Sequence, residues 1–186
     1  MKKALLAVTA LLIFVSNVNA ESPTDKGVYS LSGSISYTNT NKDGGTMISI
    51  TPAFMYFVHP NLAVGASIIY WDFKDDNFED KTYGIGPVVR YYFGKDAIYP
   101  FASVEYTYTK DKFESSFSST YTARGNDLTL GLGIDYFLSR NVALEPMIRY
   151  TFTHNDNNAS SPFGTTSSSD RSETLFMGIG INAFIF

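Results

Sequence analysis

The chain has 186 residues, a formal net charge of −4, an aromatic content of 16% and no cysteine. Its length favours a single domain, and an exported chain without cysteine must depend on its backbone ladder and packing instead of disulfides. An acidic balance with no basic patch argues against nucleic acid as a partner.

The first twenty residues, MKKALLAVTALLIFVSNVNA, have the anatomy of a secretory signal peptide. Lys2 and Lys3 precede an apolar run, and the segment ends in small residues, so we expect cleavage after Ala20. The alternative is a membrane anchor, but the run is shorter than the ~20 apolar residues that a spanning helix needs. Cleavage would remove two lysines, change the charge from −4 to −6 and leave a short N-terminal segment, 21–27.

From residue 28 onward the sequence consists of segments in which apolar and polar residues alternate, which is the period of a β-strand. The segment 127–138 shows it most clearly, because its even-numbered residues from Leu128 to Tyr136 are apolar, while Asp, Thr or Gly occupies the odd positions from Asp127 to Asp135. The last segment repeats this pattern, with Asn182 in place of Asp135. We predict eight strands, at 28–38, 48–58, 62–71, 82–93, 99–108, 127–138, 144–151 and 175–186.

The connections between these strands alternate between long polar segments and short turns. We expect polar loops at 39–45, 74–81, 109–126 and 154–172, and short turns after the second, fourth and sixth strands. Two of the short turns are internal repeats, because FVHPNLAV at 57–64 matches FLSRNVAL eighty positions later. Each suits a three-residue hairpin that ends in a left-handed residue, a conformation that Asn61 and Asn141 tolerate well.

Eight strands of about ten residues with one uniformly apolar face describe an all-β, antiparallel up-and-down transmembrane barrel over residues 28–186. The alternative is a soluble barrel with its apolar face inside. We favour the membrane barrel because the charged residues share a face with the glycines, as the crowded interior of a narrow barrel requires. The outer faces avoid charge, which would cost about 2–4 kcal/mol at the middle of the bilayer.

The chain from Val28 to Phe186 resembles the small eight-stranded outer-membrane β-barrels of Gram-negative bacteria, the outer-membrane β-barrel domain family typified by OmpA and OmpX. The resemblance rests on the two repeated turns, on the hairpin from Tyr91-Tyr92-Phe93-Gly94 to Pro100-Phe101, and on a final Gly-Ile-Gly-Ile strand that ends in Phe186. It implies a location in the outer membrane, among lipid and lipopolysaccharide.

The resemblance also implies that the barrel-insertion machinery reads the C-terminal strand through Phe186. In the family the terminal Phe faces lipid, whereas the glycine alignment places Asn182, Phe184 and Phe186 on the inner face. A bulge near Ala183 would reconcile the two.

Five charged residues fall on the predicted inner face: Arg90, Glu105, Asp135, Glu145 and Arg149. We expect Glu145 to lie opposite Asp135 across the tight turn, with Arg149 and Arg90 as the available cations and Glu105 as a natural partner of Arg90. The structural interpretation is a pairing network that fills the lumen, and the functional alternative is a proton or ion path.

We predict no catalytic, cofactor-binding or metal-binding residue. His154 is similar to the histidine of lipid A deacylase barrels, but Asp156 stands where those enzymes carry a serine nucleophile. The first functional hypothesis is a non-enzymatic protein whose surface loops bind an extracellular ligand for adhesion, defence or envelope integrity. A narrow channel for small solutes is the second, and a deacylase the third.

Overall fold

The computed structural model describes residues 22–40, 44–75, 78–94, 98–115, 118–161 and 164–186. No helix in these ranges is long and apolar enough to cross a membrane. The strands are β1 (Tyr29–Thr40), β2 (Gly44–His59), β3 (Leu62–Lys74), β4 (Phe78–Tyr92), β5 (Ile98–Ser115), β6 (Ser118–Ser139), β7 (Val142–Ser161) and β8 (Gly164–Ile185).

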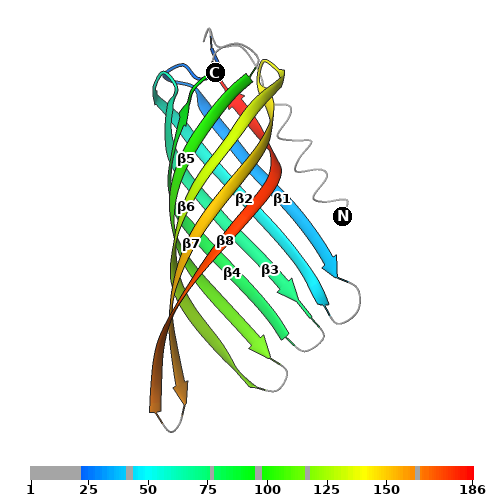
Figure 1. The fold of residues 1–186 in the computed structure, drawn as a ribbon, viewed down its shortest axis with the longest axis vertical. Coiled ribbons are helices and arrows are strands. Elements are labelled where there is room, and N and C mark those ends of the chain that lie inside the picture. The colour runs from blue at the N-terminus through cyan, green and yellow to red at the C-terminus, as the bar shows by residue number, and fades with distance from the viewer. Residues whose placement is uncertain (1–21, 41–43, 76–77, 95–97, 116–117, 162–163) are drawn as a thin grey trace.

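The eight strands form one antiparallel barrel in sequence order, closed by pairing of β1 with β8. The predicted up-and-down barrel is therefore confirmed. In Figure 1 the hairpins β1–β2, β3–β4, β5–β6 and β7–β8 extend toward one end of the barrel, and the turns that follow β2, β4 and β6 lie at the other. We call these the long-hairpin end and the short-turn end.

The outer surface of the wall is apolar and the inner surface is polar, as predicted. On β6 the even-numbered residues point outward, with Leu132 65% exposed, while Asp135 is fully buried inside. On β7 the outward residues Pro146 and Ile148 alternate with buried Glu145 in the same way. This alternation with a period of two is the property that a strand between lipid and a lumen requires.

The interior is crowded enough to explain why glycines share the inner face with charged residues. A methyl group added at Gly133 would come 2.4 Å from Cζ of Phe101, on the neighbouring strand β5. Large inward side chains are therefore accommodated by glycine on the next strand.

The strands extend far beyond their predicted ends, and the prediction that 74–81, 109–126 and 154–172 are loops was wrong. The ladder between β5 and β6 continues to Ser115 and Ser118, and that between β7 and β8 continues to Ser161 and Gly164. These segments are rich in Ser, Thr and Asn, because outside lipid a strand needs no apolar face. The backbone ladder continues, although the alternation of apolar and polar residues that indicates a strand has ended.

The two repeated turns share a register but differ in backbone conformation. His59 pairs with Leu62 and Ser139 pairs with Val142, so each connection has the predicted length. Asn61 adopts the expected left-handed conformation with φ of 66° and, among the described residues, is the only non-glycine residue with positive φ. The expectation that both turns would be of the same kind therefore fails at Asn141.

Asn61 and Asn141 nevertheless hold their neighbouring strands in the same way. The Asn61 carbonyl accepts the amide of Tyr92 at 2.9 Å, and the Asn141 carbonyl accepts the amide of Phe184 at 2.8 Å. The turn between β2 and β3 is thereby fixed to β4, and the turn between β6 and β7 is fixed to β8.

An aromatic core fills the lumen near the short-turn end. Phe57, Tyr92 and Phe184 are fully buried there, and their rings pack against one another with centroids 5.5–6.3 Å apart. The facing of the last strand is therefore settled: Phe184 points inward, and Phe186 packs against the same core. The register with β7 and β1 continues through Ala183, so no bulge reorients the strand.

The N-terminal segment covers this core from the short-turn end. Thr24 and Val28 are almost completely buried, and the hydroxyl of Thr24 donates a hydrogen bond to Oδ1 of Asn61 at 2.8 Å. The Asn61 amide in turn donates to the Thr24 carbonyl at 2.9 Å. The segment thus forms a cap on the narrow end of the lumen.

Candidate functional site: the lumen

A buried ion pair crosses the lumen between Arg90 on β4 and Glu145 on β7. Nη1 of Arg90 lies 2.5 Å from Oε2 of Glu145, and Nη2 lies 3.3 Å from Oε1, so the contact is bidentate. Both side chains are at least 97% buried, and their strands are not neighbours in the sheet. The pair therefore connects two separate parts of the wall through the interior.

Arg90 is also held by aromatic rings. Its Cζ lies 4.0 Å from the ring centroid of Phe101, within cation–π range, and Nη1 donates to the hydroxyl of Tyr92 at 3.2 Å. The guanidinium is thus fixed by a carboxylate, a ring face and a phenol, which positions it at the boundary between the aromatic core and the polar lumen above it.

Asp135 joins the same cluster through neutral partners. Its Oδ2 accepts hydrogen bonds from the Tyr92 hydroxyl at 3.0 Å and from Nδ2 of Asn182 at 2.9 Å. Asn182 in turn accepts from the hydroxyl of Ser30 at 2.8 Å. The register places Asp135 opposite Glu145, as predicted, and the two carboxylates share Arg90 and Tyr92 as their polar neighbours.

Sequence reasoning did not identify Tyr92 or Asn182 as members of this cluster. The signals were present: Tyr92 shares its parity with Arg90, and Asn182 occupies the position of Asp135 in the repeated strand pattern. We define the lumen network as Arg90, Tyr92, Asp135, Glu145 and Asn182.

Two of the predicted charged residues lie outside the lumen network. The expectation that Glu105 pairs with Arg90 was wrong, because Oε1 of Glu105 accepts hydrogen bonds from Ser67 at 2.5 Å and from Thr107 at 3.1 Å. Arg149 was expected to neutralise Asp135 and Glu145, but it is only half-buried and forms no ion pair within the described ranges. Among the described residues Glu145 forms its ion pair with Arg90, a contact across the lumen that strand parity does not predict.

Above the lumen network, toward the long-hairpin end, hydroxyl groups line the interior. Ser34 and Thr51 are hydrogen-bonded at 2.8 Å, and Thr129 and Thr151 at 2.9 Å. Together with Glu105 these residues make this half of the lumen polar, in contrast to the aromatic half toward the short-turn end.

Two aromatic bands flank the apolar outer wall. Tyr83 and Tyr91 on β4 are both about half-exposed, and Ile85 and Val89 face outward between them. The stretch from Tyr83 to Tyr91 has nine residues, within the ~9–11 residues that a tilted strand needs to cross the bilayer. The segment of β4 before Tyr83 therefore lies outside the bilayer.

Charged residues gather on that outer segment. The ammonium groups of Lys81 and Lys74 donate hydrogen bonds to Glu79, which lowers the pKa of the Glu79 carboxyl below its ordinary value. Burial, reinforced by the charge of Asp111, raises the pKa of Asp80. These groups border the long-hairpin end of the lumen.

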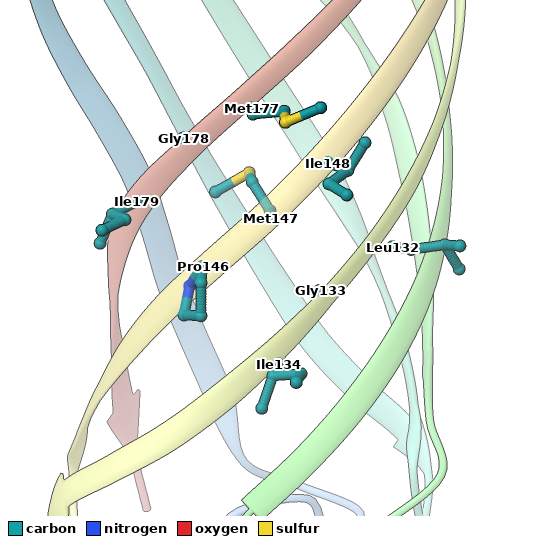
Figure 2. A pocket seen from close by; sticks show the side chains of 9 residues that line it. All are labelled: Leu132, Gly133, Ile134, Pro146, Met147, Ile148, Met177, Gly178 and Ile179. Atoms are coloured by element: carbon teal, nitrogen blue, oxygen red, sulfur yellow. The ribbon is translucent and has the colours of Figure 1, made fainter.

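A shallow apolar groove of about 710 Å³ runs over the outer face of β6, β7 and β8. Figure 2 shows Leu132, Ile148 and Met177 among the side chains that border it. The groove lies on the lipid side of the wall, because the outward residues of these strands line it.

His154 lies in β7, paired with Asn126 on β6 and Arg171 on β8. The side chain of Asp156, which replaces the expected serine, lies outside the described side chains. Within the described residues, no group of three or more His, Cys, Asp or Glu side chains is arranged to hold a metal ion.

A closed antiparallel barrel with an apolar outer wall, two aromatic bands and a charged, filled interior is an integral membrane β-barrel protein. The chain belongs to the outer membrane protein beta-barrel domain family, whose model matches residues 5–171. Membership implies a location in the outer membrane.

Solved structures show the same fold at low sequence identity. The outer membrane protein OprG from Pseudomonas aeruginosa is 17% identical, with a TM-score of 0.57 over 88% of this chain and 99% of its own. The Neisserial surface protein A is 15% identical, with a TM-score of 0.52 over 84% of this chain and 94% of its own. The N-terminal barrel domain of Pseudomonas aeruginosa OprF is 12% identical, with a TM-score of 0.55 over 86% and 98%. No curated protein matches the chain in sequence.

Proposed function

We propose that this protein is a non-enzymatic outer-membrane barrel whose function is to present extended hairpins to an extracellular ligand. The observation that carries the proposal is the β7–β8 hairpin. The last residue of β7 that pairs with β6 is Asp156, yet pairing of β7 with β8 continues to Ser161 (Figure 1). The end of this hairpin is therefore a two-stranded ribbon that stands free of the barrel wall.

The orientation follows from the family pattern of short periplasmic turns. In this orientation the long hairpins face the cell exterior, in contact with lipopolysaccharide, and the cap formed by Thr24 and Val28 faces the periplasm. The signal peptide is removed after Ala20, and the insertion machinery reads the strand that ends in Phe186. Protease added to intact cells should cut between Lys110 and Arg124, whereas cleavage confined to the turns at His59 or Ser139 would reverse this topology.

A hairpin replacement tests the proposed binding role. Residues 155–170 are replaced by Asn-Gly, and intact cells that express either form are assayed on immobilised extracellular-matrix proteins and in serum. We expect cells that carry the replacement to lose adherence or serum survival, while the amount of folded barrel at the cell surface stays unchanged. A matched variant that shortens the β5–β6 hairpin by a similar length serves as a control, and unchanged behaviour of both variants would overturn the proposal.

A narrow channel is the second candidate, favoured by the hydroxyl-lined half of the lumen around Glu105. The lumen network and the aromatic core beneath it argue for a filled barrel, since eight strands leave an interior just wide enough for side chains. Stable conductance steps in planar bilayers would support the channel. Lipid A mass spectrometry of expressing cells tests the deacylase candidate, for which the unchanged lipid is the expected result.

A further inference from the structure

Basic side chains cross the outer face of three neighbouring strands near the long-hairpin end of the wall (Figure 1). We define the basic strip as Lys81 on β4, Lys110 and Lys112 on β5, and Arg124 on β6. The three members on β5 and β6 are exposed and share the outward parity of these strands. The sequence shows no basic patch, because only the barrel brings these separate positions together.

The register places like charges of the basic strip directly opposite each other. Lys110 pairs with Arg124 on β6, and Lys112 pairs with Lys81 on β4. Opposite side chains on one face of a sheet have Cβ atoms about 4.5–5.5 Å apart, and like charges at this spacing are destabilising. Two such pairs at successive outward positions reduce the stability of the fold, and a bound anion would remove this repulsion.

Acidic neighbours neutralise the β4 end of the basic strip. Lys81 forms an ion pair with Glu79, which also pairs with Lys74 at 3.2 Å. Asp72 lies opposite Lys81 on β3 and adds a second negative charge. The excess of positive charge therefore lies on β5 and β6.

Lys110 and Arg124 form no ion pair with any described side chain. Asp111 follows Lys110 in the chain but has the inward parity of β5, and it accepts a hydrogen bond from Thr82 at 2.6 Å. Asp156 is opposite Arg124 on β7, and its side chain lies outside those described. Two exposed cations thus stand side by side on the outer face.

The β5–β6 ladder next to these cations follows the chemical order of a phosphorylated lipid. Toward the short-turn end, the outward pairs after Lys110 and Arg124 are Tyr108 with Asn126, Tyr106 with Leu128, and Val104 with Leu130. Tyrosine rings on the outside of such barrels lie at the boundary between headgroups and acyl chains. The basic strip is therefore at the level of the headgroups, and the apolar wall beside it is at the level of the acyl chains.

We propose that the basic strip binds a phosphorylated lipid of the outer leaflet, with a phosphate group on Lys110 and Arg124 and acyl chains along β5 and β6. A guanidinium donates two parallel hydrogen bonds to a phosphate, and an ammonium adds a compact charge. The site rests on the orientation given under the proposed function, which makes this lipid the lipid A part of lipopolysaccharide. It is independent of the ligand that the hairpins bind.

Native mass spectrometry of the protein in detergent micelles tests the site. The protein is titrated with lipid A that carries its phosphates and with lipid A from which the phosphates have been removed. The test variant combines Lys110→Gln with Arg124→Gln. The matched control combines Lys26→Gln with Arg140→Gln, which removes two positive charges at the short-turn end. Altered gel mobility before boiling verifies that each variant folds.

We expect the test variant to bind phosphorylated lipid A at least about tenfold more weakly than the wild type, which is the loss of about one charge-assisted hydrogen bond. The control variant should keep the wild-type affinity. Lipid A without phosphates should bind the wild type as weakly as phosphorylated lipid A binds the test variant.

Four results would overturn the proposal. An unchanged affinity of the test variant would show that the basic strip makes no contact, and an equal loss in the control would show an effect of net charge alone. Equal affinity for the two lipids would show that the apolar wall alone binds. Displacement of lipid A by an equal concentration of inorganic phosphate would show an anion site without preference for lipid. None of these results bears on the proposed binding role of the hairpins.

Discussion

Arg90 is the residue on which the interior of the barrel depends. It is the cation between Glu145 and Asp135, and it is fixed by hydrogen bonds to Glu145 and Tyr92 and by the face of Phe101. A buried carboxylate without a partner is costly, so the removal of this one side chain affects both acids.

Replacing Arg90 by Met should lower the free energy of unfolding by about 3–5 kcal/mol, because Glu145 loses the partner of its buried ion pair. The measurement is urea unfolding in detergent micelles. Arg149→Met is the matched control and should cost little, since Arg149 forms no ion pair in the described structure. An equal decrease in the free energy of unfolding of the two variants would show that Arg90 contributes no more to stability than Arg149 does.

Asp80, outside the bilayer, should give the protein a measurable dependence on pH. Burial and the charge of Asp111 raise the pKa of Asp80 above its ordinary value of 3.8, so the folded state binds this proton more tightly than the unfolded state. The stabilisation is complete below about pH 4 and is lost as the pH rises through the folded pKa.

Asp80→Asn should therefore be more stable than the wild type at pH 7, and its unfolding free energy should fall less between pH 4 and pH 7. Denaturant unfolding at a series of pH values measures both. A variant with an unchanged pH dependence would show that Asp80 has an ordinary pKa in the folded protein.

At the scale of single residues the sequence predicts which side chains face the lumen but not which of them meet. Strand parity identified Arg90, Asp135 and Glu145 as inward. It could not predict that Arg90 spans the barrel to Glu145 and bypasses Glu105, because contacts between strands that are not neighbours depend on barrel shear and side-chain length. Tyr92 was read only as part of a hairpin.

At the scale of elements, strands could be predicted only where apolar residues recur at every second position. The membrane-embedded parts of all eight strands were located, whereas the ladder from Asp156 to Ser161 was taken for a loop because its residues are polar. Backbone pairing outside lipid leaves no hydrophobic pattern in the sequence. The position and length of the short turns were predictable, but their conformation was not, since Asn61 is left-handed and Asn141 is not.

The turn at His59–Asn61 offers a test of this local geometry. Asn61 has φ of 66°, which glycine adopts freely and alanine does not. Asn61→Ala should therefore be about 1 kcal/mol less stable than Asn61→Gly, while both lose the same bond to Thr24. At Asn141, which is not left-handed, glycine should have no such advantage over alanine. A preference for glycine at both turns would mean that they share one conformation after all. Urea unfolding of the four variants measures the difference.

At the scale of the whole molecule, the protein is a barrel whose two halves differ. The short-turn half is filled by Phe57, Tyr92 and Phe184 and capped by the N-terminal segment, and the lumen network lies directly above it. The long-hairpin half is lined by hydroxyls and continues into the free-standing ribbon of the β7–β8 hairpin. This division places the filled and capped part of the fold at one end and the proposed binding surface at the other.

The most direct test of this architecture is the accessibility of β6 to oxygen in a bilayer. A nitroxide label is attached to single cysteines introduced in turn at positions 128 to 136, which is possible because the chain has no cysteine of its own. The even-numbered positions, where residues such as Leu132 face lipid, should show high oxygen accessibility, and the odd-numbered positions should show low accessibility. Accessibility that is highest at the odd positions, or that shows no period of two, would contradict a barrel with its polar face in the lumen.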